Sequence, residues 1–219
     1  DTAKTLSRYI DGIMIRTYKQ SDVETLAQCG TIPVINGLTD SYHPCQVLAD
    51  LQTVREKKGG FKGLKLAYLG DGNNVANSLL IGCAKVGMNI TVATPEGYSC
   101  DPAAIKKAQE AAVETGAKVV VTTDPVEAAR DADIVYTDTW VSMGMEEEKE
   151  RRVKAFMPYQ VNDELFSKAK PDALFMHCLP AYRGYEVTDS VIDGDRSIVF
   201  DQAENRLHVQ KAVLVKLMG

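Results

Sequence analysis

The apolar residues of this chain follow two patterns that alternate from one end to the other. Short runs rich in β-branched residues are typical of buried strands, and apolar residues spaced three and four apart are typical of helices. Strands are predicted at residues 12–17, 32–35, 64–69, 90–93, 118–122, 134–137, 173–176 and 198–200. Helices are predicted at residues 21–29, 44–58, 74–86, 102–115, 125–132, 163–169 and 203–218.

Cap residues support several of these helix ends. Ser21, Asp101 and Asp124 stand where an N-cap side chain would accept from the first free backbone N–H groups of a helix. Gly59 and Gly87 follow the last apolar residues of two helices, a position that glycine often takes. Strands and helices that alternate in this way predict an α/β fold with a doubly wound parallel sheet, covered by helices on both faces.

One long stretch fits neither pattern. Residues 140–159 are predicted to be irregular, and a loop of that length is often a functional lid. Trp140, the only tryptophan, is predicted to be a core residue. The mixed charges at residues 146–152 predict a solvated face.

Composition argues against several classes of protein. The chain has 219 residues, of which 45% are hydrophobic and 25% charged, as is ordinary for a globular protein. Its net charge is −5 and no basic stripe stands out, so nucleic acid is not an expected partner. No apolar run approaches the roughly 20 residues that span a membrane, so a membrane is not expected either.

The five cysteines and the first residue bear on compartment and processing. The number is odd and no C-x-x-C spacing occurs, which argues against a disulfide framework and a zinc site. Free thiols fit a reducing compartment, so we expect the cytoplasm, with the mitochondrial matrix or a plastid as alternatives. The sequence starts at Asp1 rather than a methionine, which predicts a fragment or a processed chain.

Ligands of an open parallel sheet bind beyond the carboxyl ends of its strands, and a glycine-rich motif lies at one such end. Residues 70–74 read GDGNN, which half-matches the dinucleotide fingerprint G-x-G-x-x-G. Val75 replaces the third glycine, and Thr94 ends the next strand where an acidic residue would hold a ribose. A nicotinamide dinucleotide is therefore a poor fit. The amides of Asn73 and Asn74 at a helix N-terminus suit a carboxylate instead.

Two further motifs carry candidate binding groups. His43 and Gln46 share one side of a helix start, where they could donate to an oxyanion and accept from an amide, although a lone histidine is more often structural. Asp138 directly follows an apolar strand, where its charge needs a cation or water, and Ser142 could share that cation.

The last motifs leave alternatives open. Cys178 follows a buried strand, and an inert buried thiol is the better interpretation than a nucleophile. The Leu179–Pro180 bond could be cis or trans, and a cis bond would aim carbonyl groups into the cleft. Arg206 could bind Glu204 or an anion, and Arg16 has the same ambiguity. Together these residues predict a site for a zwitterionic amino acid beside an anionic reactant.

Read in order, the motifs HPCQ, GDGNN, DTWVSMG, HCLPA and AENR resemble the ornithine carbamoyltransferases, and DTAKTLSRY and KQSD add to the resemblance. It covers essentially the whole chain. The resemblance implies transfer of a carbamoyl group from carbamoyl phosphate to the δ-amine of L-ornithine, giving L-citrulline and phosphate in arginine biosynthesis or the urea cycle. It also implies that no cofactor or metal is used and that the intact enzyme is a homotrimer or a multiple of trimers.

The resemblance also implies a division of the chain. Residues 1–42 would be a remnant of the carbamoyl-phosphate domain, residues 43–58 an interdomain helix and residues 59–200 the ornithine-binding domain. Residues 201–219 would be a C-terminal helix that returns to the first domain.

On the carbamoyl side, the resemblance assigns five residues. His43 and Arg16 would bind the carbamoyl oxygen, and Arg16 would also meet the phosphate. Gln46 and the carbonyl group of Leu179 would hold the carbamoyl amide, and Arg206 would support the oxygen. Fixed donors at that oxygen would lower the barrier to attack.

On the ornithine side, Asn74 would bind the carboxylate, while Asp138 and Ser142 would bind the α-ammonium. Met143 would line the pocket. Cys178 would lie near the δ-nitrogen and the carbamoyl group. The residues expected to act on the reacting atoms are Cys178, Asp138, His43 and Arg206.

One family feature is missing from these residues. The phosphate loop S-x-R-T-R does not occur here, so we expect little or no transferase activity from this chain alone. The main alternatives are a non-catalytic ornithine-binding fragment and a carbamoyltransferase for a related amine. A nicotinamide-dependent protein is a further alternative, which the sequence favours less.

Overall fold

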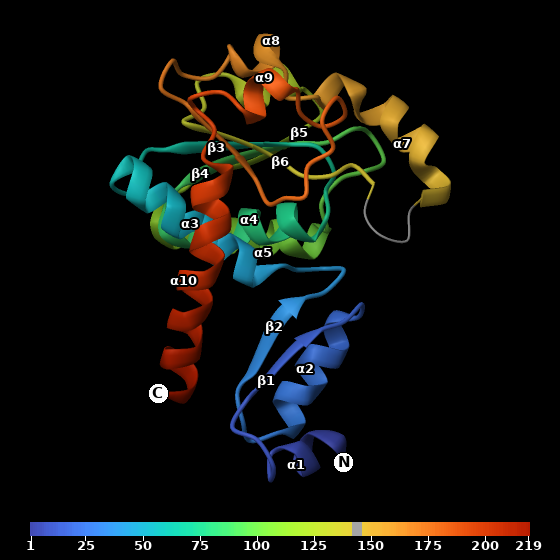
Figure 1. Cartoon of the computed structure of the whole chain (residues 1–219), viewed down its shortest axis with the longest axis vertical. Helices are drawn as coiled ribbons and strands as arrows, with labels where there is room; N and C mark the ends of the chain where they lie inside the picture. Colours follow the sequence, from blue (N-terminus) through green and yellow to red (C-terminus); the bar gives the residue numbers. More distant parts are fainter. Residues whose placement is uncertain (142–145) are drawn as a thin grey trace.

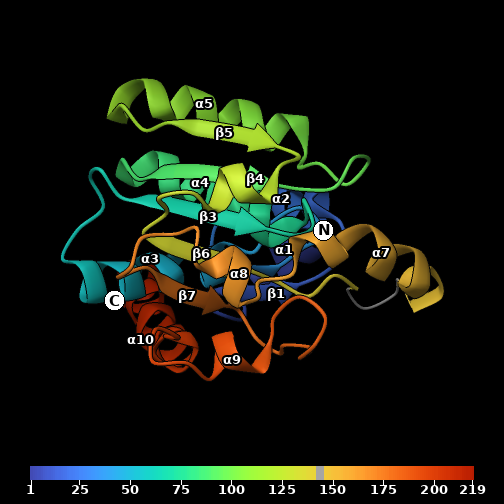
Figure 2. The same ribbon diagram turned by 90° about the horizontal axis from the view of Figure 1, so that it is seen from above.

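The computed structural model describes residues 1–141 and 146–219. Five parallel strands form its larger sheet in the order β5-β4-β3-β6-β7. Their bounds are Lys65–Leu69 for β3, Asn89–Ala93 for β4, Val119–Thr122 for β5, Ile134–Thr137 for β6 and Leu174–His177 for β7. The chain enters this sheet at its middle strand, β3, adds β4 and β5 on one side, and then returns to add β6 and β7 on the other (Figure 2). This confirms the predicted doubly wound parallel sheet.

Helices cover both faces of the larger sheet, which is why its central strands are apolar on both sides. Figure 1 shows α3 (Pro44–Lys58), α4 (Asn74–Val86) and α5 (Pro102–Thr115) beneath the sheet, where they share one apolar core with β3, β4 and β6. A second core lies on the opposite face, under α6 (Pro125–Ala129), α8 (Asp163–Phe166) and α9 (Asp189–Ile192).

A smaller layer holds the first residues of the chain. It contains α1 (Thr2–Leu6), β1 (Ile13–Arg16), α2 (Gln20–Cys29) and β2 (Val34–Leu38), and β1 and β2 pair in parallel. Helix α3 then leads into the larger sheet, and α10 (Val199–Met218) packs on α3 and extends toward the smaller layer (Figure 1). A Cβ atom on Gly12 would lie 2.6 Å from the sulfur of Met218, so the end of α10 touches the smaller layer.

Strong local signals gave correct boundaries. Helices α3, α4 and α5 and strand β6 have the predicted bounds. Asp101 accepts from the N–H of Ala103 at 2.8 Å, and Asp124 caps α6, as predicted. Gly59 and Gly87 take the left-handed conformation after α3 and α4. No helix among residues 1–141 and 146–219 is both long and apolar enough to cross a membrane.

Several predictions about elements were wrong. Residues 198–200 are not a strand, because α10 begins at Val199 and its first turn packs into the core. Residues 146–159 are not irregular but form η1 (Glu146–Glu148), α7 (Lys149–Phe156) and η2 (Met157–Tyr159). Helices α1 and α9 were not predicted.

Smaller shifts have local causes. Ser21 is not an N-cap, because α2 begins at Gln20 and the cap position belongs to Lys19. Strand β2 lies later than predicted, since its pairing with β1 places Val34 opposite Ile13 and includes the polar Asn36. Helices α6 and α8 end three residues before their predicted limits, at Ala129 and Phe166.

Candidate active site

The candidate site lies at the carboxyl ends of β3, β6 and β7, as the rule for open parallel sheets requires. The turn after β3 supplies Asn73 and Asn74, and Asp138 and Cys178 follow β6 and β7. His43 stands at the N-terminus of α3, and Arg206 lies on α10. Five different elements therefore bring the predicted residues together.

Asp138 is buried and accepts three hydrogen bonds from neutral donors. Its Oδ2 accepts from Nδ2 of Asn73 at 2.8 Å. Its Oδ1 accepts from the N–H of Thr139 at 2.7 Å and from the thiol of Cys178 at 3.0 Å. No cation pairs with it within the described residues, so its negative charge is available to an ammonium group of a ligand.

The thiol of Cys178 is held as a donor. Burial, and then the adjacent Asp138 carboxylate, raise its pKa well above the ordinary value. A thiol in this setting stays protonated at neutral pH, and only a thiolate is a strong nucleophile. The geometry therefore favours a binding role for Cys178 over nucleophilic attack.

The two adjacent asparagines have different tasks. Asn73 caps α4, because its Oδ1 accepts from the N–H groups of Val75 at 3.0 Å and Ala76 at 3.2 Å. Its Nδ2 is the group that orients Asp138. Asn74 donates instead from Nδ2 to the carbonyl oxygen of Thr39 at 2.7 Å, so a ligand carboxylate at Asn74 would have to replace that bond.

His43 borders both halves of the predicted site. Its backbone N–H donates to Oγ of Ser78 at 2.8 Å, while the buried Nδ1 of its ring has no partner among the described residues. Burial, and then the charges of Arg206 and Arg16, lower the pKa of His43 to about 4, although Asp138 opposes them. The imidazole is therefore neutral at neutral pH, and its buried Nδ1 is left without a hydrogen bond among the described residues.

Arg206 is held by amides rather than by carboxylates. Its Nη1 donates to Oε1 of Gln46 at 2.5 Å. With its amide turned to satisfy both groups, Gln210 accepts from Nη2 at 2.7 Å and Nε at 3.0 Å. Glu204, which was one predicted partner, pairs with His208 instead. The guanidinium charge thus stays available to an anion.

Arg16 lies at the end of β1 and is exposed, and its positive charge contributes to the lowered pKa of His43. The Leu179–Pro180 bond, which the sequence left open, is cis, and Leu179 itself has a φ of 55°. The carbonyl group of Leu179 belongs to the same loop as Cys178, at the end of β7.

The loop after β7 is fixed by residues to which the sequence analysis gave no role. Nδ1 of His177 accepts from the N–H of Leu179 at 2.8 Å, so its Nε2 carries the proton and donates to Glu186 at 3.1 Å. Both side chains are fully buried. The HCLP motif pointed to His177, but no local pattern identified Glu186.

A metal ion fits this cluster poorly. Ligand atoms of Asp138, His177 and Cys178 lie within 4.8 Å of one another. However, both ring nitrogens of His177 are already bonded, to Leu179 and Glu186, and the thiol is protonated. Binding a metal here would break these contacts.

Comparison with known proteins identifies the family. The carbamoyl-phosphate-binding domain model of the aspartate/ornithine carbamoyltransferases matches residues 1–56, and the aspartate/ornithine-binding domain model matches residues 62–217. The chain belongs to the aspartate/ornithine carbamoyltransferase family. It is 61% identical over 219 residues to the ornithine carbamoyltransferase of Thermococcus kodakarensis, covering 100% of this chain and 70% of that protein.

Solved structures of the family agree with this fold. The ornithine carbamoyltransferase from Pyrococcus furiosus superposes with a TM-score of 0.96 at 59% identity, covering 100% of this chain and 70% of the other. The enzyme from Giardia lamblia gives 0.93 at 37% identity, covering 100% of this chain and 73% of the other. Membership in this family removes the nicotinamide-dependent alternative.

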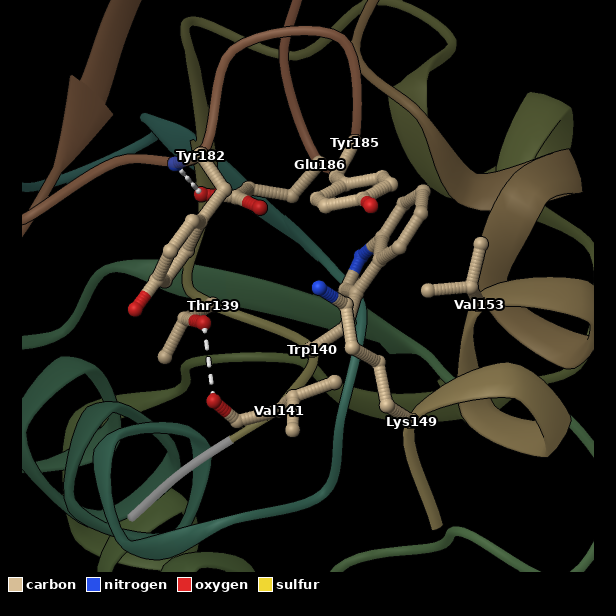
Figure 3. Close-up of a pocket in the computed structure, with 8 residues that line it drawn as sticks. All are labelled: Thr139, Trp140, Val141, Lys149, Val153, Tyr182, Tyr185 and Glu186. Carbon is tan, nitrogen blue, oxygen red and sulfur yellow. Dashed lines mark hydrogen bonds between the residues drawn. The ribbon is translucent and has the colours of Figure 1, made fainter. Parts of the chain in front are cut away.

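Two predicted residues of this family member, Ser142 and Met143, lie outside the described residues. A cavity of about 140 Å³ lies beside Trp140 and Val141 (Figure 3). It is lined by Thr139, Trp140, Val141, Lys149, Val153, Tyr182, Tyr185 and Glu186. Trp140 is a buried residue, as predicted.

Helix α7 of this carbamoyltransferase is anchored by a buried arginine. Arg152 was predicted to lie on a solvated face, but only 4% of it is exposed, because it pairs with Asp71 and donates from Nε to the carbonyl oxygen of Trp140 at 2.5 Å. Its guanidinium also lies over the ring of Tyr98, 5.0 Å from the centroid. Burial raises the pKa of Asp71 to about 6 despite this partner.

Proposed function

We propose that this chain transfers the carbamoyl group of carbamoyl phosphate to the δ-amine of L-ornithine. The neutral amine attacks the carbonyl carbon, the bond from that carbon to the phosphate oxygen breaks, and the bonding pair leaves with phosphate. The amine passes a proton to the departing phosphate, and the product is L-citrulline. The relatives named above as ornithine carbamoyltransferases support this reaction over one with a related amine.

On the ornithine side, Asp138 attracts the α-ammonium, because its carboxylate is surrounded by neutral donors only. Asn74 binds the carboxylate at the N-terminus of α4, where the helix dipole favours a negative charge. Cys178 lies beside the δ-nitrogen, and Ser142 and Met143 complete this side of the proposed site.

On the carbamoyl side, His43, Arg16 and Arg206 stabilise the negative charge that attack creates on the carbonyl oxygen. Gln46 and the carbonyl group of Leu179 accept from the carbamoyl amide. Oε1 of Gln46 already faces Arg206, so the acceptor for the amide and the donor for the oxygen are adjacent. Holding both substrates in line contributes much of the remaining acceleration.

The observation that carries the proposal is the position of His43 between the two sides. The pKa of its imidazole responds to Arg206 and Arg16 from the anion side and to Asp138 from the amino-acid side. The geometry supports this position, because His43 stands at the N-terminus of α3, three residues before Gln46, and its backbone N–H donates to Oγ of Ser78 on α4, the helix that begins at Asn74.

Citrulline formation tests this proposal. The chain would be supplied with carbamoyl phosphate and, in separate reactions, L-ornithine, putrescine, N-acetylornithine or L-aspartate. Although little activity was expected from these residues alone, the similarity to ornithine carbamoyltransferases leads us to expect citrulline from ornithine and no carbamoylated product from the other amines. Preferred carbamoylation of another amine would contradict the proposal.

The larger organisation is also a proposal. We infer a division into residues 1–42, 43–58, 59–200 and 201–219. We also infer a homotrimer or a multiple of trimers, which sedimentation of the protein tests. The five free cysteines support a reducing compartment, the cytoplasm or alternatively the mitochondrial matrix or a plastid.

A further inference from the structure

A buried carboxyl group lies behind the proposed carbamoyl site. Asp50 stands one helical turn after Gln46 on α3, and only 1% of it is exposed. It forms no ion pair within the described part of the chain. Burying such a group without a cation is unfavourable, so its presence is not explained by the stability of the core alone.

Three side chains from three elements donate to Asp50. Its Oδ1 accepts from Nε2 of Gln46 at 2.8 Å and from Nε2 of Gln202 at 2.7 Å. Its Oδ2 accepts from the hydroxyl of Tyr136 at 3.2 Å. The carboxyl group therefore connects α3, α10 and β6.

The donor to the side-chain oxygen of each glutamine determines the orientation of its amide group. Oε1 of Gln46 accepts from Arg206, and a guanidinium can only donate. Oε1 of Gln202 accepts from the backbone N–H of His177 at 3.0 Å. Both NH₂ groups then point at Oδ1 of Asp50, and that of Gln202 also donates to the hydroxyl oxygen of Tyr136 at 3.0 Å.

We propose that Asp50 is a positioning residue for carbamoyl transfer, because it holds the amide of Gln46 with its oxygen toward Arg206 and the carbamoyl group. Through Gln202 it also ties the loop of His177 and Leu179 to the same point. The inference rests on the proposed function, which gives Gln46 and Arg206 their roles. Without Asp50, the NH₂ group of Gln46 would turn to another acceptor and could present the wrong end to the carbamoyl amide.

The state of Asp50 can be followed in solution. Burial raises the pKa of Asp50 to about 7. The titratable or charged groups near it are Tyr136 from β6, Arg206 from α10, Cys83 from α4 and Cys178 from the loop after β7. The side-chain amide signals of Gln46 and Gln202 should therefore shift with pH near neutrality.

Two substitutions at Asp50 and one matched control test the inference. Asp50→Asn keeps the size and an acceptor oxygen, whereas Asp50→Leu removes the acceptor. The control is Thr53→Val, which loses another buried contact between α3 and α10, where Thr53 accepts from Asn205 at 3.0 Å. None of these residues contacts the proposed substrates.

The first measurement is a ¹⁵N spectrum of the side-chain amides between pH 5.5 and 8.5. We expect the Gln46 and Gln202 signals to move with a midpoint near 7 in the parent and in T53V, and to stay constant in D50N. A Gln46 signal that is the same in D50N as in the parent, both in its position and in its pH dependence, would overturn the inference. This result does not depend on catalysis, and it decides the matter even if D50L does not fold.

The second measurement is the rate of citrulline formation. We expect D50L to lower kcat/KM for carbamoyl phosphate by roughly tenfold to a hundredfold, with KM for ornithine little changed. D50N and T53V should stay within about threefold of the parent. If D50L and T53V lost the same fraction of kcat/KM, Asp50 would have only a structural role, and the inference would be overturned. If the parent forms no citrulline, the proposed function fails while the amide titration still tests the position of Gln46.

Discussion

The guanidinium of Arg206 donates to the side-chain oxygen of Gln46 at 2.5 Å, which joins the final helix to the first turn of α3. The two residues are 160 positions apart, yet they place a cation and an amide acceptor next to each other at the end of the sheet. A carbamoyl group needs this combination, a donor for its oxygen and an acceptor for its amide.

Replacing Arg206 should therefore weaken carbamoyl transfer without weakening the binding of ornithine. We expect Arg206→Met to lower the rate of citrulline formation by roughly a hundredfold or more, because a fixed donor to the developing oxyanion is lost. Ornithine should bind with unchanged affinity. Arg183→Met is the control, since Arg183 is exposed and pairs with Asp189 and Asp193. If R206M and R183M formed citrulline at similar rates, Arg206 would not act on the carbamoyl oxygen.

The thiol of Cys178 should be unreactive. Its pKa is raised by burial and by Asp138, so almost no thiolate exists near neutral pH. We expect iodoacetamide at pH 7.5 to label the exposed Cys29 at least roughly a hundredfold faster than Cys178. Peptide mass spectrometry after short exposures measures both rates. Equal labelling of the two would show that Cys178 is an activated nucleophile.

His43 should make the fold sensitive to mild acid. Its pKa is about 4 in the folded chain and 6.5 in the unfolded one, so unfolding takes up a proton between these values. The stability that depends on neutral His43 is present above pH 6.5 and falls as the pH drops toward 4. Between these two pH values, the equilibrium constant for unfolding should rise by up to about tenfold for each unit by which the pH falls.

Urea unfolding of the parent and His43→Gln at pH 7, 5.5 and 4.5 measures this effect. The parent should lose stability relative to H43Q as the pH falls. A difference between the two proteins that stays constant across this range would contradict the lowered pKa.

The pair of Arg152 and Asp71 should be coupled in stability. Arg152→Leu leaves a buried Asp71 without its partner, so we expect a loss of roughly 3–5 kcal/mol in the free energy of unfolding. The double variant with Asp71→Asn should regain much of that loss, because the uncompensated charge is gone. Urea unfolding of both single variants and the double variant gives the coupling. Strictly additive losses would mean that the two side chains act independently.

Elements with strong local signals were predictable from the sequence. Helix α5 is one, since Asp101 supplies the cap, Pro102 fits the first turn and Gly116 takes the left-handed conformation after its end. The positions of Asn74, Asp138 and Cys178 could also be predicted, because the carboxyl ends of parallel strands lie together.

Features that depend on distant partners could not be predicted. The burial of Arg152 depends on Asp71, which lies 81 positions away, so the charged run around it looked like a solvated face. Asp50 looked like an ordinary polar position of a long helix, because Tyr136 and Gln202 are far away in the sequence. The partner of Arg206 was missed for the same reason, since the nearby Glu204 was the obvious candidate.

Calorimetric titration with L-ornithine tests the central claim most directly. Two buried aspartates flank strand β6, and they make a matched pair of variants. Asp138 faces the proposed site, whereas Asp133 accepts from the N–H of Lys65 at 2.8 Å and from Nζ of Lys170 at 2.7 Å at the opposite end. We predict that the parent and Asp133→Asn bind ornithine alike, and that Asp138→Asn binds it roughly tenfold more weakly or worse. Equal binding by D138N, or no binding by a folded parent chain, would contradict the account.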